Sequence, residues 1–180
     1  MRVFIAVMLP DAVRHALEPQ IEQLRSLAPD ISWEVPERWH ITLSFLGNVE
    51  PSVLRDLEPR LERAASRTDP FTLRLSGIGR FGNRVLHVKI DGERPALRRL
   101  AERTTASARR VGIAMREERY RPHVTVARSR RRVELPPLVE SGRGVTSAEW
   151  PVTEFVVINS VLGSERHYEI VDRHTLGVSL

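Results

Sequence analysis

The stretch His40-Ile41-Thr42-Leu43 of this 180-residue sequence returns 83 positions later as His123-Val124-Thr125-Val126. The same offset aligns what lies upstream: the apolar segment 3–7 falls on 86–90, and the helical pattern around Leu17 falls on that around Leu100. An offset that holds over several elements indicates a duplicated unit. We therefore expect one domain, residues 1–180, built from two pseudo-symmetric lobes with repeat units at roughly 2–47 and 85–129.

Each copy has the alternation of a half-buried strand. Side chains of a strand point to its two faces in turn, so His40 and Thr42 share one face while Ile41 and Leu43 share the other. The second copy repeats this pattern, and its apolar face would also pack on a lobe core. The histidine and threonine of each strand are then left facing a groove, with one histidine on either side.

The composition is that of an ordinary globular protein, with 41% hydrophobic and 28% charged residues. The sequence contains no cysteine, which excludes disulfides, thiolate metal sites and thiol nucleophiles. The formal charge of +5 is compatible with a polyanionic partner and equally with an ordinary solvated surface. No apolar run approaches the roughly 20 residues of a membrane-spanning helix. We expect a cytoplasmic monomer with no membrane association.

Three segments have the apolar spacing of amphipathic helices. The first begins near Asp11 and the second near Ser52, and each contains a proline, Pro19 or Pro59, which we expect to kink or restart the helix. The third spans 95–112, with a proline in its first turn and a glycine at its end. The apolar side of these helices would face a sheet.

Other segments have the composition of strands, turns and loops. Residues 71–76 alternate apolar and polar side chains, and residues 154–162 and 166–171 form a predicted hairpin around Gly163-Ser164. The glycines of 77–82 are interpreted as a turn rather than a phosphate-binding loop, because no helix follows them. The arginine- and proline-containing stretch 128–143 is predicted to be a long exposed loop.

Three stretches of the chain resemble the RNA 2′,3′-cyclic phosphodiesterases, or 2′-5′ RNA ligases of the LigT type, within the 2H phosphoesterase superfamily. They are residues 2–6, 39–47 and 121–128, and the resemblance covers nearly the whole chain. It implies an α+β fold, bilobal and duplicated, in which antiparallel sheets line a central cleft and helices lie outside. It also implies hydrolysis of RNA terminal 2′,3′-cyclic phosphates to 2′-phosphomonoesters, reversible 2′-5′ ligation, and neither metal nor other cofactor.

Two histidines suit the opening of a cyclic phosphate, which needs a base for the attacking water and an acid for the departing oxygen. The resemblance assigns His40 as the proton donor and His123 as the proton acceptor, an order that the sequence alone does not give. Thr42 and Thr125 would hydrogen-bond the non-bridging phosphate oxygens. Arg128 is either a further substrate contact or a surface salt bridge, since strict alternation puts it on the face opposite Thr125.

The remaining candidates fall into three groups. The other histidines are interpreted as surface or core residues, and no zinc-binding spacing is present; they are His15, His87, His167 and His174. Four aromatic residues near the motifs either stack a terminal base or pack in the core, namely Trp33, Trp39, Phe45 and Tyr120. The arginine cluster Arg128, Arg130, Arg131 and Arg132 either holds RNA backbone or is a solvated loop.

The expected partner is RNA that ends in a 2′,3′-cyclic phosphate, tRNA fragments among them. One alternative is a non-catalytic protein that binds RNA or cyclic nucleotides, and the presence of both histidines argues against it. Another is a phosphodiesterase for a small cyclic nucleotide or an ADP-ribose cyclic phosphate. The motifs do not discriminate this last alternative from the RNA enzyme.

Overall fold

The structure is a computed structural model that describes residues 1–130, 133–163 and 166–177. The strands of this part form one antiparallel sheet in the order β7-β4-β5-β6-β3-β1-β8-β9, and the short β2 pairs with β6. Their bounds are β1 Arg2–Met8, β2 Ser32–Trp33, β3 His40–Asn48, β4 Phe71–Phe81, β5 Val85–Gly92, β6 His123–Arg128, β7 Trp150–Val152, β8 Glu154–Val161 and β9 His167–Thr175. The two strands that begin with the repeated motif, β3 and β6, are therefore neighbours in the middle of the sheet.

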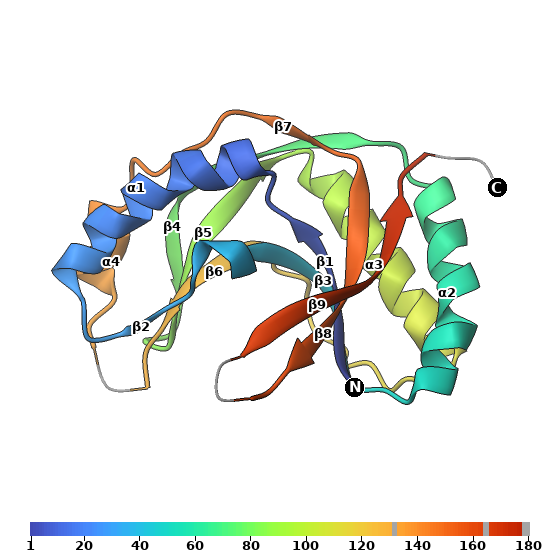
Figure 1. Ribbon diagram of the computed structural model, residues 1–180. Helices are drawn as coiled ribbons and strands as arrows, with labels where there is room; N and C mark the ends of the chain where they lie inside the picture. The colour runs from blue at the N-terminus through green and yellow to red at the C-terminus, as the bar shows by residue number, and fades with distance from the viewer. Residues whose placement is uncertain (131–132, 164–165, 178–180) are drawn as a thin grey trace.

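Helices cover the ends of this curled sheet. Figure 1 shows α1 and α4 near one end and α2 and α3 near the other. Their bounds are α1 Asp11–Leu27, α2 Pro51–Ser66, α3 Arg94–Arg110 and α4 Pro136–Ser141, and a 3-10 turn, η1, spans Pro36–Arg38. The prediction of an α+β fold with an antiparallel sheet and outer helices is confirmed.

The helix of each repeat unit packs outside that unit. Helix α3 lies against β3, where the Ser44 hydroxyl is 2.7 Å from the Thr104 hydroxyl. Helix α1 is joined to the segment beside β4, because the Gln20 side chain both donates to and accepts from the backbone of Thr146, at 2.9 and 3.0 Å. The two halves of the molecule thus share one hydrophobic core.

The two faces of the sheet differ in what covers them. The main core fills the space between the sheet and the helices and includes Leu17, Ile41, Leu100 and Val124, all with no exposed surface. Burying one such aliphatic side chain stabilises the fold by about 1.5–3 kcal/mol. On the opposite face the described residues form a smaller apolar cluster around Phe4. His40 and His123 lie on that second face, because their neighbours Ile41 and Val124 point into the main core.

The helix predictions are mostly confirmed. The third helix has its proline in the first turn and is followed by Gly112 at a φ of 85°, a left-handed conformation that suits glycine. Helices α1 and α2 run through Pro19 and Pro59 without restarting. Each proline removes one backbone hydrogen bond, and the buried leucines on either side hold the helix together across it.

Two loop predictions were wrong. Part of the stretch 128–143 is helix α4, because Pro136 and Pro137 suit a first turn and Leu138 packs into the core. Residues 77–81 belong to strand β4, and the chain reverses only after Phe81. The late hairpin is confirmed by the pairing of β8 with β9; Ser164 of its turn lies outside the described residues, as do Arg131 and Arg132 of the arginine cluster.

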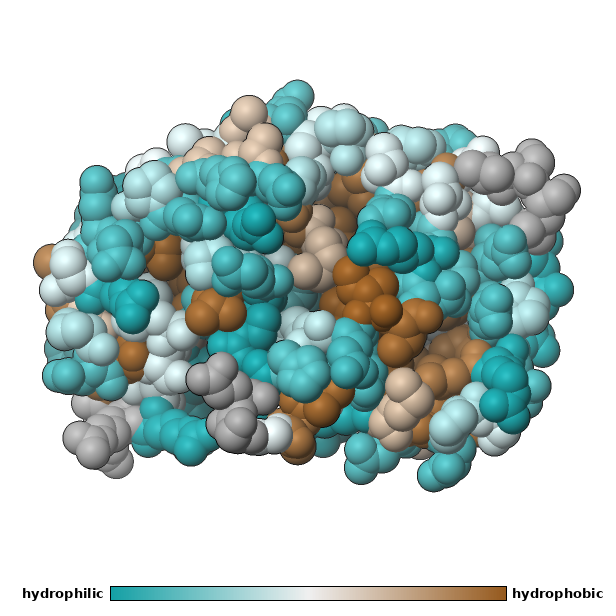
Figure 2. All heavy atoms as spheres, in the orientation of Figure 1, coloured by the Kyte–Doolittle hydropathy of each residue, from teal (hydrophilic) through white to brown (hydrophobic). Residues whose placement is uncertain are grey.

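The face of the molecule drawn in Figure 2 is largely hydrophilic. Figure 2 shows hydrophobic residues gathered over β9, where Ile170 and Val171 are 41% and 42% exposed. No helix among the described residues is long and apolar enough to cross a membrane.

Candidate active site

The pairing of β3 with β6 brings the two motifs together. Ile41 is the partner of Val124, and both side chains are buried in the main core. The antiparallel register then sets His40 beside Thr125 and Thr42 beside His123, all on the other face. Diagonal neighbours in a regular sheet lie about 7–8 Å apart. The predicted site residues thus share one face of two adjacent strands, with the histidines at opposite corners.

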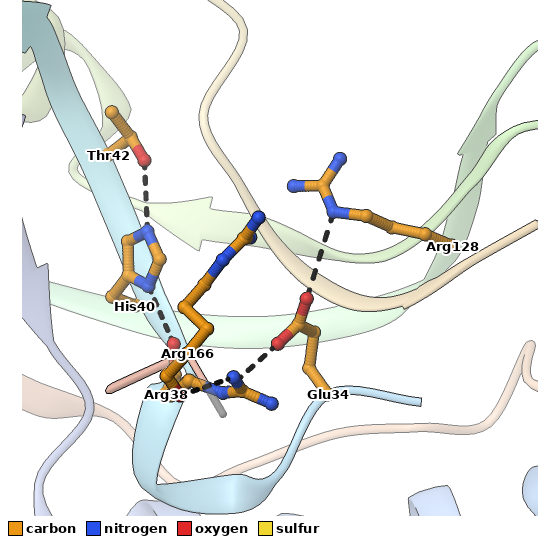
Figure 3. Close-up of polar contacts among 6 residues, drawn as sticks. All are labelled: Glu34, Arg38, His40, Thr42, Arg128 and Arg166. Atoms are coloured by element: carbon orange, nitrogen blue, oxygen red, sulfur yellow. Dashed lines mark hydrogen bonds and ion pairs between the residues drawn. The ribbon is translucent and has the colours of Figure 1, made fainter. Parts of the chain in front are cut away.

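Both imidazoles are held in the same way. The Nδ1 of His40 donates to the carbonyl oxygen of Arg38 at 2.6 Å, and that of His123 donates to the carbonyl oxygen of Arg121 at 2.7 Å. A carbonyl oxygen only accepts, so Nδ1 carries the proton in each neutral ring. Each Nε2 is left for the site, and that of His40 lies 3.1 Å from the Thr42 hydroxyl (Figure 3).

A β-bulge turns Arg128 toward this face. Leu86 pairs with Ala127 but His87 pairs with Thr125, so Val126 has no partner on β5. The extra residue reverses the alternation, and Val126 and Ala127 are both buried before Arg128 emerges. The side chains of β6 therefore do not alternate strictly at this point. The bulge places Arg128 on the same face as Thr125, which a phosphate contact from Arg128 requires.

The same bulge occurs in β3 and exposes an aromatic ring. Ile5 pairs with Ser44 and Ala6 with Thr42, which leaves Leu43 without a partner, 83 positions before Val126. Phe45 emerges after this bulge, is 53% exposed, and has the Arg2 guanidinium 5.5 Å from its ring centre. Phe45 is thus the repeat counterpart of Arg128 on the site face.

The other three aromatic candidates belong to the framework of the fold. Trp39 is 2% exposed in the main core, and the Trp33 indole donates to the carbonyl oxygen of Ala28 at 2.8 Å. The Tyr120 hydroxyl donates to the carbonyl oxygen of Thr42 at 2.9 Å and so fastens the chain before β6 to β3. Only Phe45 of the four presents a largely exposed ring.

Sequence reasoning missed Glu34, which lies between two arginines. Its carboxylate is 3.3 Å from the Arg38 guanidinium and 3.7 Å from that of Arg128, and its side chain is only 17% exposed (Figure 3). No sequence motif marks this residue. It reaches the site because β2 pairs with the end of β6, and the Glu34 amide donates to the carbonyl oxygen of Val126 at 2.8 Å.

Electrostatics distinguish the two histidines. Burial is the main cause that lowers the pKa of both imidazoles, and the positive charge of Arg128 acts in the same direction on each. The negative charge of Glu34 acts against this on His40 alone and favours its protonated form. The His123 charge in turn disfavours protonation of His40, so protonation of both rings at once is disfavoured.

Aromatic rings from other strands of the sheet pack against each imidazole. The Phe4 ring lies 4.8 Å and the Tyr168 ring 5.6 Å from the His40 ring. His87, interpreted from sequence only as a core or surface residue, is buried 5.2 Å from the His123 ring. The repeat offset, which aligns His87 with Phe4, was the signal that could have found it.

Comparisons with known proteins agree with the motif. A model of the 2′-5′ RNA ligase superfamily matches residues 11–163. An RNA 2′,3′-cyclic phosphodiesterase of Archaeoglobus fulgidus is 32% identical over 90% of this chain and 92% of its own, and one of Thermus thermophilus is 34% identical over 90% and 83%. A third relative, from Geobacillus stearothermophilus, is 30% identical, and the chain spans about half (55%) of that protein's length.

Solved structures give the same result. A protein of Thermus thermophilus, 29% identical, superposes with a TM-score of 0.80 over 98% of both chains. Escherichia coli LigT complexed with 3′-AMP, 26% identical, gives 0.79 over 97% of both. The chain therefore belongs to the 2′-5′ RNA ligase superfamily and, within it, to the family of RNA 2′,3′-cyclic phosphodiesterases, which are enzymes.

Proposed function

We propose that this protein hydrolyses RNA terminal 2′,3′-cyclic phosphates to 2′-phosphomonoesters, with His40 as general acid and His123 as general base. One observation carries the proposal: two imidazoles with carbonyl-bound Nδ1 atoms present Nε2 on the same face of adjacent strands. The names of the relatives, RNA 2′,3′-cyclic phosphodiesterases, supply the substrate class. The binding of 3′-AMP by the similar LigT protein is compatible with a nucleotide in this groove.

The reaction uses each imidazole once. Nε2 of His123 accepts a proton from water as the water oxygen bonds to phosphorus. The bond from phosphorus to the ribose 3′ oxygen breaks, and His40 donates its proton to that oxygen, which leaves the phosphate on the 2′ oxygen. Glu34 supports this order, because its charge favours the protonated form of His40 and has no such effect on His123.

Hydroxyls and a guanidinium stabilise the phosphate. Thr42 and Thr125 lie beside the histidines on the same face and would donate to the non-bridging oxygens, where charge builds up in the transition state. Arg128 adds a positive charge at one end of the groove, and the bulge at Val126 directs it there. We assign all three residues to substrate binding.

Phe45 is our candidate for the terminal base. Its exposed ring lies on the site face, beyond Thr42 and at the end of the groove away from Arg128. Stacking of a base on an aromatic side chain contributes about 1–3 kcal/mol per base and tolerates every base. The groove would then contact phosphate at its centre and the nucleoside at one side.

Several finer points belong to the same proposal. The two imidazoles supply both proton transfers, so we propose a metal-independent reaction, and the same groups run in reverse would permit 2′-5′ ligation with a ribose hydroxyl in place of water. The two pseudo-symmetric lobes would relate the acid strand to the base strand. The monomeric state, the cytoplasmic location and tRNA fragments as substrates stay predictions.

The test is an oligoribonucleotide that ends in a 2′,3′-cyclic phosphate, incubated with the purified protein in EDTA and followed by phosphorus NMR. We expect a 2′-phosphomonoester in the presence of the chelator. A 3′-phosphate product would show that the assigned scissile bond is wrong. Activity lost in EDTA and restored by a divalent metal would refute the metal-independent mechanism.

A further inference from the structure

His87 forms a wall of the site beside the proposed base. It lies on β5, its Cα is the partner of Thr125, and it is 7% exposed. Its ring centre is 5.2 Å from that of His123, with the ring planes at 57°. This is the separation of aromatic rings in van der Waals contact. One side of the His123 imidazole therefore touches another imidazole rather than water.

Two residues of β4, Phe81 and Gly79, restrict the position of the His87 ring. Phe81 packs on it at 4.4 Å, and the same Phe81 ring meets the His123 ring edge-on at 4.8 Å. A Cβ added at Gly79 would lie 2.6 Å from Cε1 of His87, so only glycine leaves space for the ring there. His87 cannot move away from His123 without disturbing β4.

The repeat provides an internal comparison for this contact. The 83-residue offset aligns His87 with Phe4, whose ring lies 4.8 Å from the His40 ring. In both copies an aromatic ring from the adjacent strand supports the motif histidine. Because phenylalanine has no titratable group, ring packing is the feature that the two copies share.

We propose that His87 is a positioning residue for His123, acting as an uncharged aromatic wall that fixes the base's ring and keeps water from one side of it. The expected effect of His87 on the reaction rate rests on the proposed function, whereas its expected effect on the position and titration of His123 does not. The ring needs to be flat, buried and neutral; it does not need to exchange a proton.

The electrostatic surroundings agree with a neutral His87. Burial, with the neighbouring His123 charge second, lowers its pKa to about 4, so the ring is uncharged at neutral pH. The titratable and charged groups around His123 are His40 from β3, His87 and Lys89 from β5, and Arg128 from its own strand. Protonation of His87 would add a further positive charge to this set.

The experiment follows the His123 Cε1 proton by NMR through a pH titration in His87→Ala and His87→Phe. Burial is the main cause that lowers the pKa of His123. His87→Ala admits water, so the pKa of His123 should rise toward its ordinary value and the acid limb of kcat/KM should move to higher pH. We expect kcat to fall roughly tenfold with KM within about twofold. His87→Phe should restore both the titration and the rate.

His174→Ala is the matched control. His174 is also a buried histidine, 5% exposed and stacked on Phe155 at 5.0 Å, but it lies on β9. It should lower thermal stability without moving the His123 titration. If His87→Ala does not fold, Gly79→Ala replaces it, since the new Cβ would push the His87 ring and alter the same titration.

Two results would overturn the positioning role. One is a His123 titration that is the same in His87→Ala as in the natural protein. The other is a His87→Phe protein as impaired as His87→Ala, which would mean that His87 acts through its nitrogen atoms. The NMR titration needs no substrate. If the natural protein fails to open cyclic phosphates, the proposed function is wrong, and the titration still decides whether His87 positions His123.

Discussion

Strands β3 and β6 have the same local structure in different surroundings. Both begin with a histidine whose Nδ1 donates to the carbonyl two residues before it, and both bulge one residue after the threonine. After the bulge β3 presents Phe45 and β6 presents Arg128. In the proposed mechanism the repeat supplies two equivalent proton-transfer groups, and the residues around them give each group a separate task.

The surroundings differ most in charge. The His40 side has the carboxylate of Glu34, which favours the protonated imidazole, whereas no acidic group of the described residues has this effect on His123. An acid and a base can therefore arise from the same motif without any change in the motif itself. Three experiments test this difference between the strands, from the proton-transfer groups to the substrate contacts and then to the neighbouring charge.

The largest effect should come from the histidines. His40→Ala and His123→Ala should each lower kcat/KM on an oligoribonucleotide cyclic phosphate by about a hundred- to ten-thousandfold, the range for loss of a general acid or base. The double variant should be little worse than either single one, because the two groups act in one step. His167→Ala, at an exposed residue of β9, is the control and should retain full activity. Independent, multiplying losses would argue against a shared transition state.

The second effect separates Phe45 from Arg128. Arg128→Ala should lower kcat/KM about tenfold or more on every cyclic phosphate, because a charge-assisted contact to phosphate contributes about 1.5–3 kcal/mol. Phe45→Ala should cost a comparable amount only when the substrate carries a base. A nucleoside 2′,3′-cyclic phosphate and its abasic ribose analogue make the comparison, and Arg98→Ala on the outer helix α3 is the control. Equal losses on the abasic analogue would remove Phe45 from base binding.

The smallest effect is a shift of one pH limb. Glu34 raises the pKa of His40, so Glu34→Gln should lower it, and the acid form of His40 should be lost at a lower pH. The alkaline limb of kcat/KM should therefore move to lower pH, while the acid limb, set by His123, should stay. Glu37→Gln, an exposed carboxylate three residues on, should move neither limb. Movement of the acid limb instead would exchange the roles of the two histidines.

The sequence predicted the parts of the fold that depend on local periodicity. The third helix and the late hairpin followed from apolar spacing and turn residues, and they are confirmed. The α+β class, which the family resemblance implied, is confirmed as well. Helix α4 was missed because it has only six residues and its formation depends on Leu138 reaching the core. Pro19 and Pro59 do not restart their helices, because tertiary packing outweighs the loss of one hydrogen bond.

The amino-acid sequence by itself determined which residues form the repeated strands and which of their side chains share a face, because alternation along a strand is a local property. Only the tertiary structure decided that the two strands are neighbours through Ile41 and Val124, that a bulge returns Arg128 to the site face, and that Glu34 and His87 stand beside opposite histidines. Those relations depend on strand order and register, which long-range packing sets and no short stretch of sequence encodes.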